Sequence, residues 1–331
     1  MDILLAATAL ENHRGLLDSV AIDGTRWLTI GPDGTIRLDE TDVEIDPTEV
    51  RPDVAWMTSD VLDGAAARRF FGVVTRSESL RWIQSQAAGF DHPVFGDLVR
   101  RGVRLTSSHI AGPPIADYVL RAALDHLQDA DAWRRAAAEQ RWEQHEFVEV
   151  GSTRWLIIGL GSIGIEVATR AAACGAEVIG VRRSPDGTES VDSVIRPDQV
   201  LDALPSAQVV VLATPASAST NGLVDASFLA AMRTDALLIN IGRGALVDEA
   251  ALITALDQGR PAAAVLDVTA TEPLPADDPL WSHPKVTVTP HSSAQGDGRH
   301  ARAASVFADN LARYVAGDAL RHEVTAADLD A

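Results

Sequence analysis

A short apolar run followed by three spaced glycines constrains this chain more than any other feature. Residues 155–158 are apolar, and Gly159, Gly161 and Gly164 lead from them into a helical pattern. In such a unit the first glycine permits a tight turn, the second lets the backbone approach a pyrophosphate, and the third lets the helix pack closely on the strand. The N-terminus of the helix then faces the phosphates. A second apolar run at 178–181 completes a βαβ unit, so the segment predicts a dinucleotide site, with a glycine turn in another α/β domain as the alternative.

The length and the charge limit the classes of protein to consider. At 331 residues with 46% hydrophobic content, the chain is long enough for two domains with separate cores. Its net charge of −19 argues against nucleic acid or an anionic membrane as the main partner, because both would repel it. No apolar run approaches membrane-spanning length, and the first ten residues predict a strand and not a signal peptide.

A single cysteine, Cys174, excludes any disulfide within the chain. This is compatible with a reducing cytoplasm, and we therefore expect a cytoplasmic protein. Cys174 stands in an alanine-rich helical pattern and is predicted to lie in the core. Histidines and carboxylates do not recur at metal-ligand spacing, so no metal site is expected.

Alternating strand and helix patterns predict two α/β domains. In the first hundred or so residues, short apolar runs separated by helical segments lie at 2–7, 27–30, 54–57, 79–84 and 103–106. Two prolines at 113–114 then open a helical pattern over 115–140. Beyond the glycine-rich unit, apolar runs with the length of buried parallel strands lie at 209–213, 236–241, 263–268 and 285–289.

The last helical pattern decides the expected domain boundaries. Residues 298–316 are helical in pattern, and no strand is expected after them in the same domain. This segment would therefore fold back onto the first domain and make that domain discontinuous. We predict a substrate domain from residues 1–112 plus 295–331, and a dinucleotide-binding domain from 113–294.

A pair of arginines stands where cofactor choice is made in a βαβ unit of this kind. After its second strand, an NAD-binding unit places a carboxylate that accepts hydrogen bonds from the ribose hydroxyls. Here Arg182, Arg183 and Ser184 follow that strand. Arginine would bind the 2′-phosphate of NADP, and the missing carboxylate removes the group that would repel it. The pattern favours NADP(H) and leaves NAD(H) possible; an exposed turn with two solvated arginines is the alternative.

Three later segments place charged residues after predicted strands, where ligands gather in open α/β sheets. Arg243, Glu272 and His291 supply a cation, a carboxylate and an imidazole, which suffices for hydride transfer to a carbonyl acid. Arg243 would hold the substrate carboxylate, His291 would move the proton, and Glu272 would orient His291. Taken singly, each of these residues has a structural interpretation that is equally good. Arg243 could cap a helix, Glu272 could be a loop residue before Pro273, and His291 could be a turn residue after Pro290.

In their order along the chain, these motifs resemble those of the D-isomer-specific 2-hydroxyacid dehydrogenases. The resembling segments cover most of the chain and lie at 87–91, 114–117, 159–164, 214–220, 240–249, 267–273 and 290–291. The resemblance implies that Arg243, Glu272 and His291 are the catalytic set. It also implies that the backbone N–H groups around Ala88 and Gly89 cradle the substrate carboxylate, beside Arg243.

The resemblance also extends the expected cofactor site. Asp267 stands at the family position near the nicotinamide carboxamide. The residues expected at the cofactor are Gly159, Gly161, Ser162, Ile163, Gly164, Arg182, Arg183, Ser184, Thr214, Pro215, Ile241 and Asp267.

Two positions depart from the pattern of the family. Arg182 replaces the acidic residue of NAD-preferring members, and in this the chain resembles the NADPH-using glyoxylate and hydroxypyruvate reductases. Asp117 stands where Glu is usual. Formate dehydrogenases share the implied fold, but their pattern pairs a Gln with the His, whereas this chain has Glu272 and His291.

The resemblance implies two Rossmann-like α/β domains with parallel sheets and an active-site cleft between them. It implies reduction of a small 2-oxo acid, such as glyoxylate or hydroxypyruvate, to the D-2-hydroxy acid, with His291 as proton donor. It also implies a homodimer, with the helix from Ile115 in the contact. Two alternatives stay open. One is an NAD-dependent dehydrogenase of another 2-hydroxy acid, and the other is a dinucleotide-sensing protein, like the corepressors that resemble these dehydrogenases, which binds the cofactor without turnover.

Overall fold

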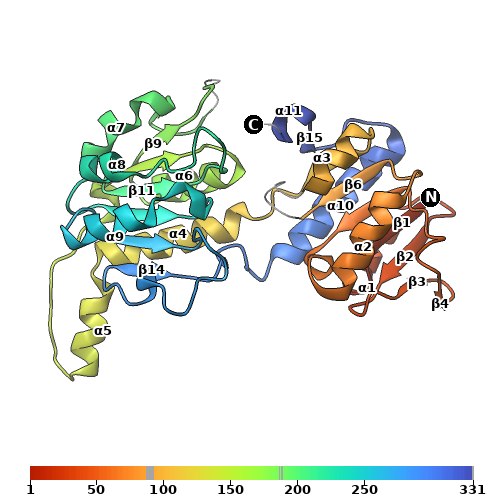
Figure 1. Ribbon diagram of the computed structural model, residues 1–331, viewed down its shortest axis with the longest axis horizontal. Helices are drawn as coiled ribbons and strands as arrows, with labels where there is room; N and C mark the ends of the chain where they lie inside the picture. The colour runs from red at the N-terminus through yellow and green to blue at the C-terminus, as the bar shows by residue number, and fades with distance from the viewer. Residues whose placement is uncertain (87–92, 186, 188, 330–331) are drawn as a thin grey trace. The chain divides into compact units, whose positions relative to one another are not determined.

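Two α/β units, each built around its own β-sheet, make up the computed structural model of the chain (Figure 1). The structure describes residues 1–86, 93–185, 187 and 189–329. The first unit consists of Met1–Ile110 and Asp297–Ala331, and the second of Ala111–Gly296. The boundaries expected from the sequence differ from these by two residues at each junction.

The sheet of the first unit has eight strands in the order β15-β7-β6-β5-β1-β2-β3-β4. They are β1 (Asp2–Ala6), β2 (Arg26–Ile30), β3 (Ile36–Leu38), β4 (Val43–Glu44), β5 (Val54–Met57), β6 (Trp82–Ser85), β7 (Arg104–Ser107) and β15 (Glu323–Val324). From β7 to β2 the neighbours are parallel. By contrast, β3, β4 and β15 pair antiparallel at the two edges.

These antiparallel edge strands correct the sequence analysis. The expectation that no strand follows the last long helix is wrong, because β15 comes after it and pairs with β7. Strands of two or three residues, such as β4 and β15, are too short to show an alternation of apolar and polar positions. Such strands can therefore be recognised only from their hydrogen-bonded pairing in the folded structure.

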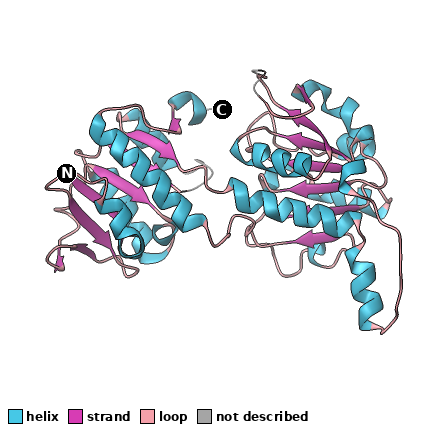
Figure 2. Cartoon of the chain, turned by 180° about the vertical axis from the view of Figure 1, so that it is seen from behind, coloured by secondary structure: helices cyan, strands magenta, loops and turns pink. Residues whose placement is uncertain are grey.

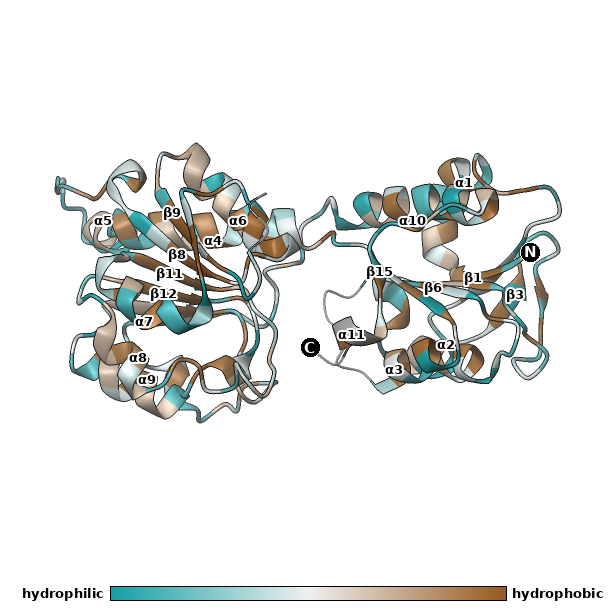
Figure 3. Ribbon diagram, turned by 90° about the horizontal axis from the view of Figure 1, so that it is seen from above, coloured by the Kyte–Doolittle hydropathy of each residue, from teal (hydrophilic) through white to brown (hydrophobic). Residues whose placement is uncertain are grey.

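Helices cover both faces of this sheet, with α1 and α10 on one side and α2 and α3 on the other (Figure 3). The helical segments are α1 (Ala7–Asp18), η1 (Ser59–Val61), α2 (Gly64–Arg76), α3 (Pro93–Arg100), α10 (Arg299–Ala316) and α11 (Ala326–Leu329). Aromatic rings join α10 to the strands: Phe307 stacks on Trp56 at 4.7 Å and on Trp82 at 5.2 Å between ring centroids. Stacked aromatic rings of this kind add to the free energy of burying their apolar area.

A buried polar contact also ties α10 to the sheet. The side-chain amide of Asn310 donates to Gln84 Oε1 at 2.9 Å, and Thr106 Oγ1 donates to the same oxygen at 3.3 Å. Asn310 Oδ1 accepts from the backbone N–H of Arg321 at 2.8 Å. Asn310, Gln84 and Thr106 are all fully buried. Because a buried amide is costly without partners, these contacts fix where the C-terminal segment lies on the first unit.

The second unit has a seven-stranded sheet in the order β10-β9-β8-β11-β12-β13-β14, and every pair of neighbours is parallel. The strands are β8 (Arg154–Ile158), β9 (Glu177–Val181), β10 (Ser193–Ile195), β11 (Val209–Leu212), β12 (Leu237–Asn240), β13 (Ala263–Leu266) and β14 (Val286–Val288). The chain leaves β8 for β9 on one side and returns to β11 on the other side. This reversal is the topological switch point of a doubly wound sheet.

Helices flank this sheet on both faces as well (Figure 2). The helical segments are α4 (Gly112–Leu127), α5 (Ala130–Ala138), η2 (Val150–Ser152), α6 (Ser162–Ala173), η3 (Pro197–Gln199), α7 (Val200–Ala203), η4 (Leu204–Ser206), α8 (Ala226–Ala231), η5 (Gly244–Leu246), α9 (Glu249–Asp257) and η6 (Pro279–Trp281). Along β8, Trp155 and Ile157 belong to the core beneath α4 and α6, whereas Leu156 and Ile158 belong to the core on the opposite face. Alternate side chains of a strand point to opposite faces, so a strand buried on both faces is apolar throughout.

Two local predictions in this unit are wrong. The pattern over 115–140 is not one helix, since α4 ends at Leu127 and α5 starts after Asp129. Asp129 has φ of 45° and accepts a hydrogen bond from the Ala132 N–H, which begins a new helix. Cys174 is exposed and not in the core, because α6 ends at Ala173 and Cys174 follows its last turn. None of the helices in the described part of the chain is both long and apolar enough to cross a membrane.

Two histidines of the first unit face each other at the ends of paired strands. His109 follows β7 and His322 precedes β15, and their ring centroids lie 4.2 Å apart. Burial lowers the pKa of His109, and the nearby His322 lowers it further. Burial also lowers the pKa of His322, as does the charge of Arg321.

This pair predicts that acid destabilises the first unit. Because the folded state lowers the pKa of both imidazoles, the unfolded chain binds more protons below about pH 6.5, so this stability is present above that pH and is lost as the pH falls. Urea unfolding followed by tryptophan fluorescence at about pH 7.5 and 5.5 measures the loss. We expect His322→Gln to reduce the loss and His145→Gln, in the other unit, to leave it unchanged. An equal loss in the parent and in His322→Gln would contradict the prediction.

Candidate active site

The carboxyl ends of six parallel strands in the second unit lie in one row. Their last residues are aligned by the strand register, and they are Val181, Ile158, Leu212, Asn240, Leu266 and Val288. The segments that follow therefore leave the sheet at the same edge. In open α/β sheets this edge is where ligands bind, next to the switch point between β8 and β11. Every site residue predicted in the second unit follows one of these strands.

The three glycines after β8 have different surroundings. Gly159 has φ of 105°, and a Cβ there would lie 2.6 Å from the carbonyl oxygen of Ala213. A Cβ on Gly164 would lie 1.9 Å from the carbonyl oxygen of Gly159. A Cβ on Gly161 would meet no atom within 4 Å. Gly159 and Gly164 are thus required by the fold itself, whereas the bare backbone of Gly161 faces open space.

The helix that follows these glycines is suited to bind an anion. Gly161 is the N-cap of α6, and it provides no side-chain hydrogen bond to the first turn. The first turn also holds no acidic residue that would compete with an anion. Ser162 is exposed and Ile163 is half-buried. The N–H groups at a helix start need acceptors, so this turn fits the phosphates of a dinucleotide.

Backbone contacts also join the next three loops of this edge. A Cβ on Gly242 would lie 2.6 Å from the carbonyl oxygen of Thr214, next to Pro215. A Cβ on Gly244 would lie 2.0 Å from the carbonyl of Thr269. The loops after β11, β12 and β13 therefore touch through their main chains, and a side chain at either glycine would push them apart.

The loop after β12 carries Arg243 and is held by Asn240. The buried Asn240 amide donates to the carbonyl of Arg243 at 2.9 Å and accepts from the Gly242 N–H at 3.1 Å. Arg243 Nη1 donates to the carbonyl of Gly242 at 2.8 Å. The side chain of Ile241 is 5% exposed and packs in the core, so only its main chain reaches the site edge.

A buried carboxylate, Asp267, holds the segment that follows β14. Asp267 is 2% exposed, and its Oδ1 accepts from Thr289 Oγ1 at 2.6 Å and from the Ser292 N–H at 2.9 Å. The Ser293 N–H donates to Asp267 Oδ2 at 3.1 Å. Tyr118 of α4 lies 2.7 Å from Thr289 through its hydroxyl. Asp267 therefore anchors this segment, and its expected contact with the cofactor stays a prediction.

The anchored segment brings His291 to Glu272. The backbone N–H of His291 donates to the carbonyl of Asp267 at 2.8 Å, and His291 has φ of 50°. Its Nδ1 lies 2.9 Å from Glu272 Oε2. Glu272 Oε1 accepts from the N–H of Thr269 at 3.2 Å. Both side chains are about half exposed, at 54% for His291 and 40% for Glu272, so the pair is accessible to a ligand.

Arg182 has a partner that the sequence analysis did not consider. Its Nη1 lies 2.9 Å from Glu189 Oε1, and the Glu189 side chain is only 3% exposed. The other oxygen of Glu189 accepts from the Gly187 N–H at 2.9 Å. Arg183 and Ser184 are exposed. The Glu189 carboxylate thus lies near the end of β9, directly after which the sequence has no acidic residue. It belongs to a residue seven positions after Arg182 in the chain.

Two predicted substrate-binding residues, Ala88 and Gly89, lie outside the described residues. Among the residues that the structure does describe, no group of three or more His, Cys, Asp and Glu side chains has the arrangement of a metal site.

A family model matches the unit that carries this site. The model described as "D-isomer specific 2-hydroxyacid dehydrogenase, NAD binding domain" covers residues 120–293, which is more than half of the chain. The chain belongs to this family. The residues matched contain the glycine turn, Arg243, Glu272 and His291.

A relative identified by sequence supports the assignment to this family. Glyoxylate/hydroxypyruvate reductase A of Serratia proteamaculans is 34% identical over 178 residues, which are 54% of this chain and 57% of the relative. The match thus spans little more than half the length of that enzyme.

Solved structures match over nearly the whole length. A D-isomer specific 2-hydroxyacid dehydrogenase family protein of Aeromonas salmonicida has a TM-score of 0.80 at 28% identity, covering 98% of this chain and 99% of that one. A D-isomer specific 2-hydroxyacid dehydrogenase of Xanthobacter autotrophicus, solved with NADPH and MES, has a TM-score of 0.74 at 30% identity and covers 98% of both chains. The predicted fold of two α/β domains with parallel sheets is confirmed.

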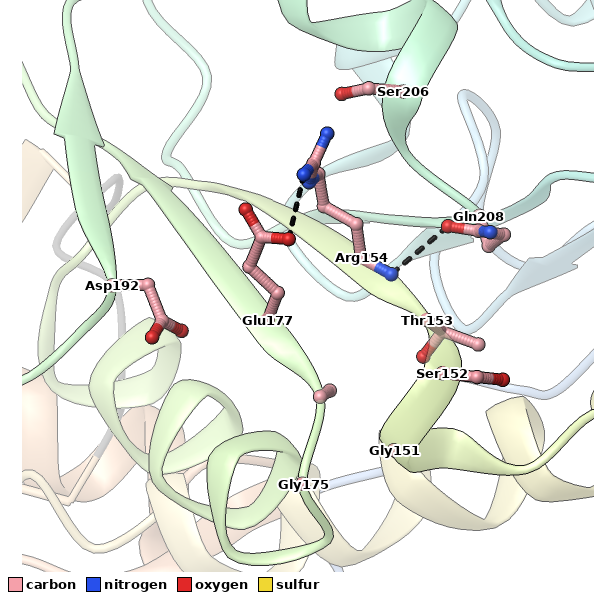
Figure 4. A pocket seen from close by; sticks show the side chains of 10 residues that line it. Gly151, Ser152, Thr153, Arg154, Gly175, Glu177, Asp192, Ser206 and Gln208 are labelled. Carbon is pink, nitrogen blue, oxygen red and sulfur yellow. Dashed lines mark hydrogen bonds and ion pairs between the residues drawn. The ribbon is translucent and has the colours of Figure 1, made fainter.

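A polar hollow lies on the opposite side of the same sheet from this site, where the strands begin (Figure 4). It has a volume of about 450 Å³ and lies at the amino ends of β8, β9 and β11. Arg154 and Glu177 pair across it at 2.7 Å, and the Arg154 N–H donates to Gln208. None of the predicted site residues that the structure describes lines it. The hollow therefore plays no part in the site described above.

Sequence reasoning missed residues that support the site from elsewhere in the chain. These are Tyr118, Glu189 and Glu249, whose contacts reach Thr289, Arg182 and Ala270. Glu249 belonged to a recognised motif, but nothing in its spacing indicated its partner. For Tyr118 and Glu189 the sequence carried no signal. The Tyr118 contact joins segments that only the folded sheet brings together, and Glu189 meets Arg182 within one connection at a spacing that no motif specifies.

Proposed function

We propose that this chain is an NAD(P)-dependent oxidoreductase that reduces a small 2-oxo acid, such as glyoxylate or hydroxypyruvate, to the D-2-hydroxy acid. The observation that carries the proposal is the 2.9 Å contact of His291 with Glu272, at the sheet edge where the glycine turn also lies. Family membership and the reductase relative support the reaction type.

The roles of the residues follow from their chemistry. A bound nicotinamide dinucleotide would supply the hydride to C2 of the acid. His291 donates a proton to the oxygen on C2, while Glu272 accepts from Nδ1 and so leaves Nε2 as the donor. The transfer leaves a neutral imidazole whose remaining proton, on Nδ1, is held by Glu272.

Substrate orientation is assigned to Arg243, and the expected contribution of Ala88 and Gly89 stays a prediction. A guanidinium binds a carboxylate through two parallel hydrogen bonds, which fixes both distance and plane. Asn240 holds the main chain of the loop from which Arg243 projects. Such orientation of the reacting atoms lowers the barrier independently of proton transfer.

The preferred cofactor in this proposal is NADPH. Arg182 directly follows β9, with Arg183 and Ser184 exposed beside it, and the Xanthobacter autotrophicus relative was solved with NADPH. The pairing of Arg182 with Glu189 has two effects on this choice. It holds the guanidinium in place, and it offers a carboxylate that competes with the 2′-phosphate.

Replacing His291 tests the reaction. We expect His291→Ala to lower kcat by roughly a hundredfold to ten-thousandfold, because the proton donor is lost, while cofactor affinity stays within about twofold. The measurements are initial rates of NADPH and NADH oxidation with hydroxypyruvate and glyoxylate, and cofactor binding by fluorescence titration.

The matched control is His126→Ala, which removes a histidine beside Asp235 at the opposite sheet edge. It should retain the parental rate. Unchanged turnover in His291→Ala would remove this residue from the mechanism. Cofactor binding by the parent without turnover of either acid would favour a dinucleotide-sensing protein instead.

Reversing the charge at Arg182 tests the cofactor preference. We expect Arg182→Asp to lower the ratio of NADPH-dependent to NADH-dependent kcat/KM by roughly tenfold to a hundredfold, the size of one charge-assisted contact. Arg233→Asp makes the same change of charge before β12, at the opposite edge, and should leave the ratio unchanged. An unaltered ratio in Arg182→Asp would show that this side chain does not bind the 2′-phosphate. A parent that turns over faster with NADH than with NADPH would support the NAD-dependent alternative.

A homodimer is the assembly that we propose. In Figure 1, α5 and the extended segment after it project from the body of the second unit. Along this arm, Trp142 is 97% exposed and Phe147 is 48% exposed. Large apolar side chains gathered on a projecting segment are typical of an interaction surface.

The mass in solution tests this assembly. Light scattering should give about twice the 35.2 kDa of one chain, because burial of the arm against a second copy removes its apolar side chains from water. We expect Trp142→Asp to shift the population to monomer. Leu201→Asp, an equally drastic change at an exposed residue of α7, should not. A monomeric parent at micromolar concentration would refute the dimer.

A further inference from the structure

We propose that Glu249 is a positioning residue that holds the loop of Glu272, and through it the contact between Glu272 and His291. The inference rests on the proposed function. Glu249 Oε1 accepts a hydrogen bond from the backbone N–H of Ala270 at 2.7 Å, across 21 residues of sequence. Ala270 lies two residues before Glu272 in the loop that follows β13.

The side chain of Glu249 is not needed to cap its own helix. Asp248 is the N-cap of α9, and its Oδ1 accepts from the N–H of Ala251 at 3.0 Å. A carboxylate in the first helical turn usually faces solvent and interacts with the helix dipole. Glu249, the first residue of α9, instead reaches across to a neighbouring loop. This contact therefore serves the loop and not the helix.

Hydrogen bonds from its own backbone hold this loop. Two successive backbone N–H groups donate to two different carboxylates: Thr269 to Glu272 and Ala270 to Glu249. The Thr269 hydroxyl donates to the carbonyl of Thr271 at 2.9 Å, which closes the turn internally. The direction of the turn thus sets where the Glu272 carboxylate points, and Glu249 is the contact that fixes the turn to α9.

Close packing makes this connection stiff. Gly244 lies against the carbonyl of Thr269 so closely that any side chain there would overlap it. Gly244 is the neighbour of Arg243, and Glu249 begins the helix five residues later. The segment from Arg243 to Glu249 therefore contacts the loop of Glu272 at two points. A packed contact of this kind transmits a displacement of one segment to the other.

The electrostatic surroundings show that the contact holds a partly buried carboxylate. Burial raises the pKa of Glu249, the Ala270 N–H lowers it, and the negative charge of Asp278 raises it. A carboxylate kept in such a place without its donor would gain by turning out to water. The Ala270 N–H is thus the group that retains Glu249 in this orientation.

Two substitutions at Glu249 separate positioning from general stability. Glu249→Ala removes the acceptor, whereas Glu249→Gln keeps a carbonyl oxygen that can accept from Ala270. We expect Glu249→Ala to lower kcat by roughly tenfold to a hundredfold, the effect of a small displacement of a catalytic group, with the KM for the cofactor within about twofold of the parent. Glu249→Gln should recover most of kcat. Glu177→Ala, which removes a paired carboxylate at the opposite sheet edge, is the matched control and should behave like the parent.

Two readouts do not depend on turnover. Hydrogen exchange of the Ala270 amide should accelerate in Glu249→Ala and remain slow in Glu249→Gln. The NMR signals of the His291 imidazole should move in Glu249→Ala toward those of Glu272→Gln, because both changes weaken the same contact. Midpoints of urea unfolding show whether each variant is folded.

The outcomes distinguish this inference from the proposed function. If the parent turns over no 2-oxo acid, the proposed function fails, and the exchange and NMR readouts alone decide the role of Glu249. The inference is overturned if folded Glu249→Ala leaves the His291 signals in place. In an active parent, it is equally overturned by a kcat within twofold of the parent in Glu249→Ala, or by Glu249→Gln as impaired as Glu249→Ala.

Discussion

The carboxylate of Asp267 is the group on which the arrangement of the site depends. It is buried at the end of β13 and accepts hydrogen bonds from Thr289, Ser292 and Ser293, which follow the neighbouring strand. An unpartnered carboxylate in this place would be severely destabilising, and each charge-assisted hydrogen bond contributes about 1.5–3 kcal/mol. The segment of His291 therefore cannot leave the sheet edge without exposing or orphaning this charge. The position of the imidazole follows from a structural requirement of the fold.

The same edge depends on main-chain contacts that only glycine allows. Gly159 lies against Ala213, Gly242 against Thr214, and Gly244 against Thr269. The loops after four adjacent strands are thus packed through their backbones, with no side chains between them. Charged groups on these loops are then held by short connections, which is the condition for precise orientation of reacting groups. Glu249 fits this plan, because it connects the loop of Glu272 to the segment that begins with Arg243.

Parts of the fold were predictable for identifiable reasons. Buried parallel strands are continuous apolar runs, so β8, β11, β12 and β13 were recognised from their composition alone. Short edge strands such as β10 and β15 carry no such signal and were missed. The break between α4 and α5 was missed because Asp129 is as compatible with the surface of one long helix as with the start of a second one. Cys174 was misplaced since its exposure depends on where α6 ends.

By itself, the sequence determined the class of fold, the place of the dinucleotide turn and the identity of the charged residues after each strand. These follow from local rules, because strand composition, glycine spacing and the position of a residue after a strand are all properties of a short segment. Only the tertiary structure decided which of those residues meet. The pairings of Glu272 with His291 and of Glu249 with Ala270 join segments whose distance is set by strand order and register, whereas Arg182 meets Glu189 within the connection from β9 to β10. The physical reason is that a hydrogen bond depends on atomic positions within a few tenths of an ångström, and no pattern of residue types along the chain specifies these.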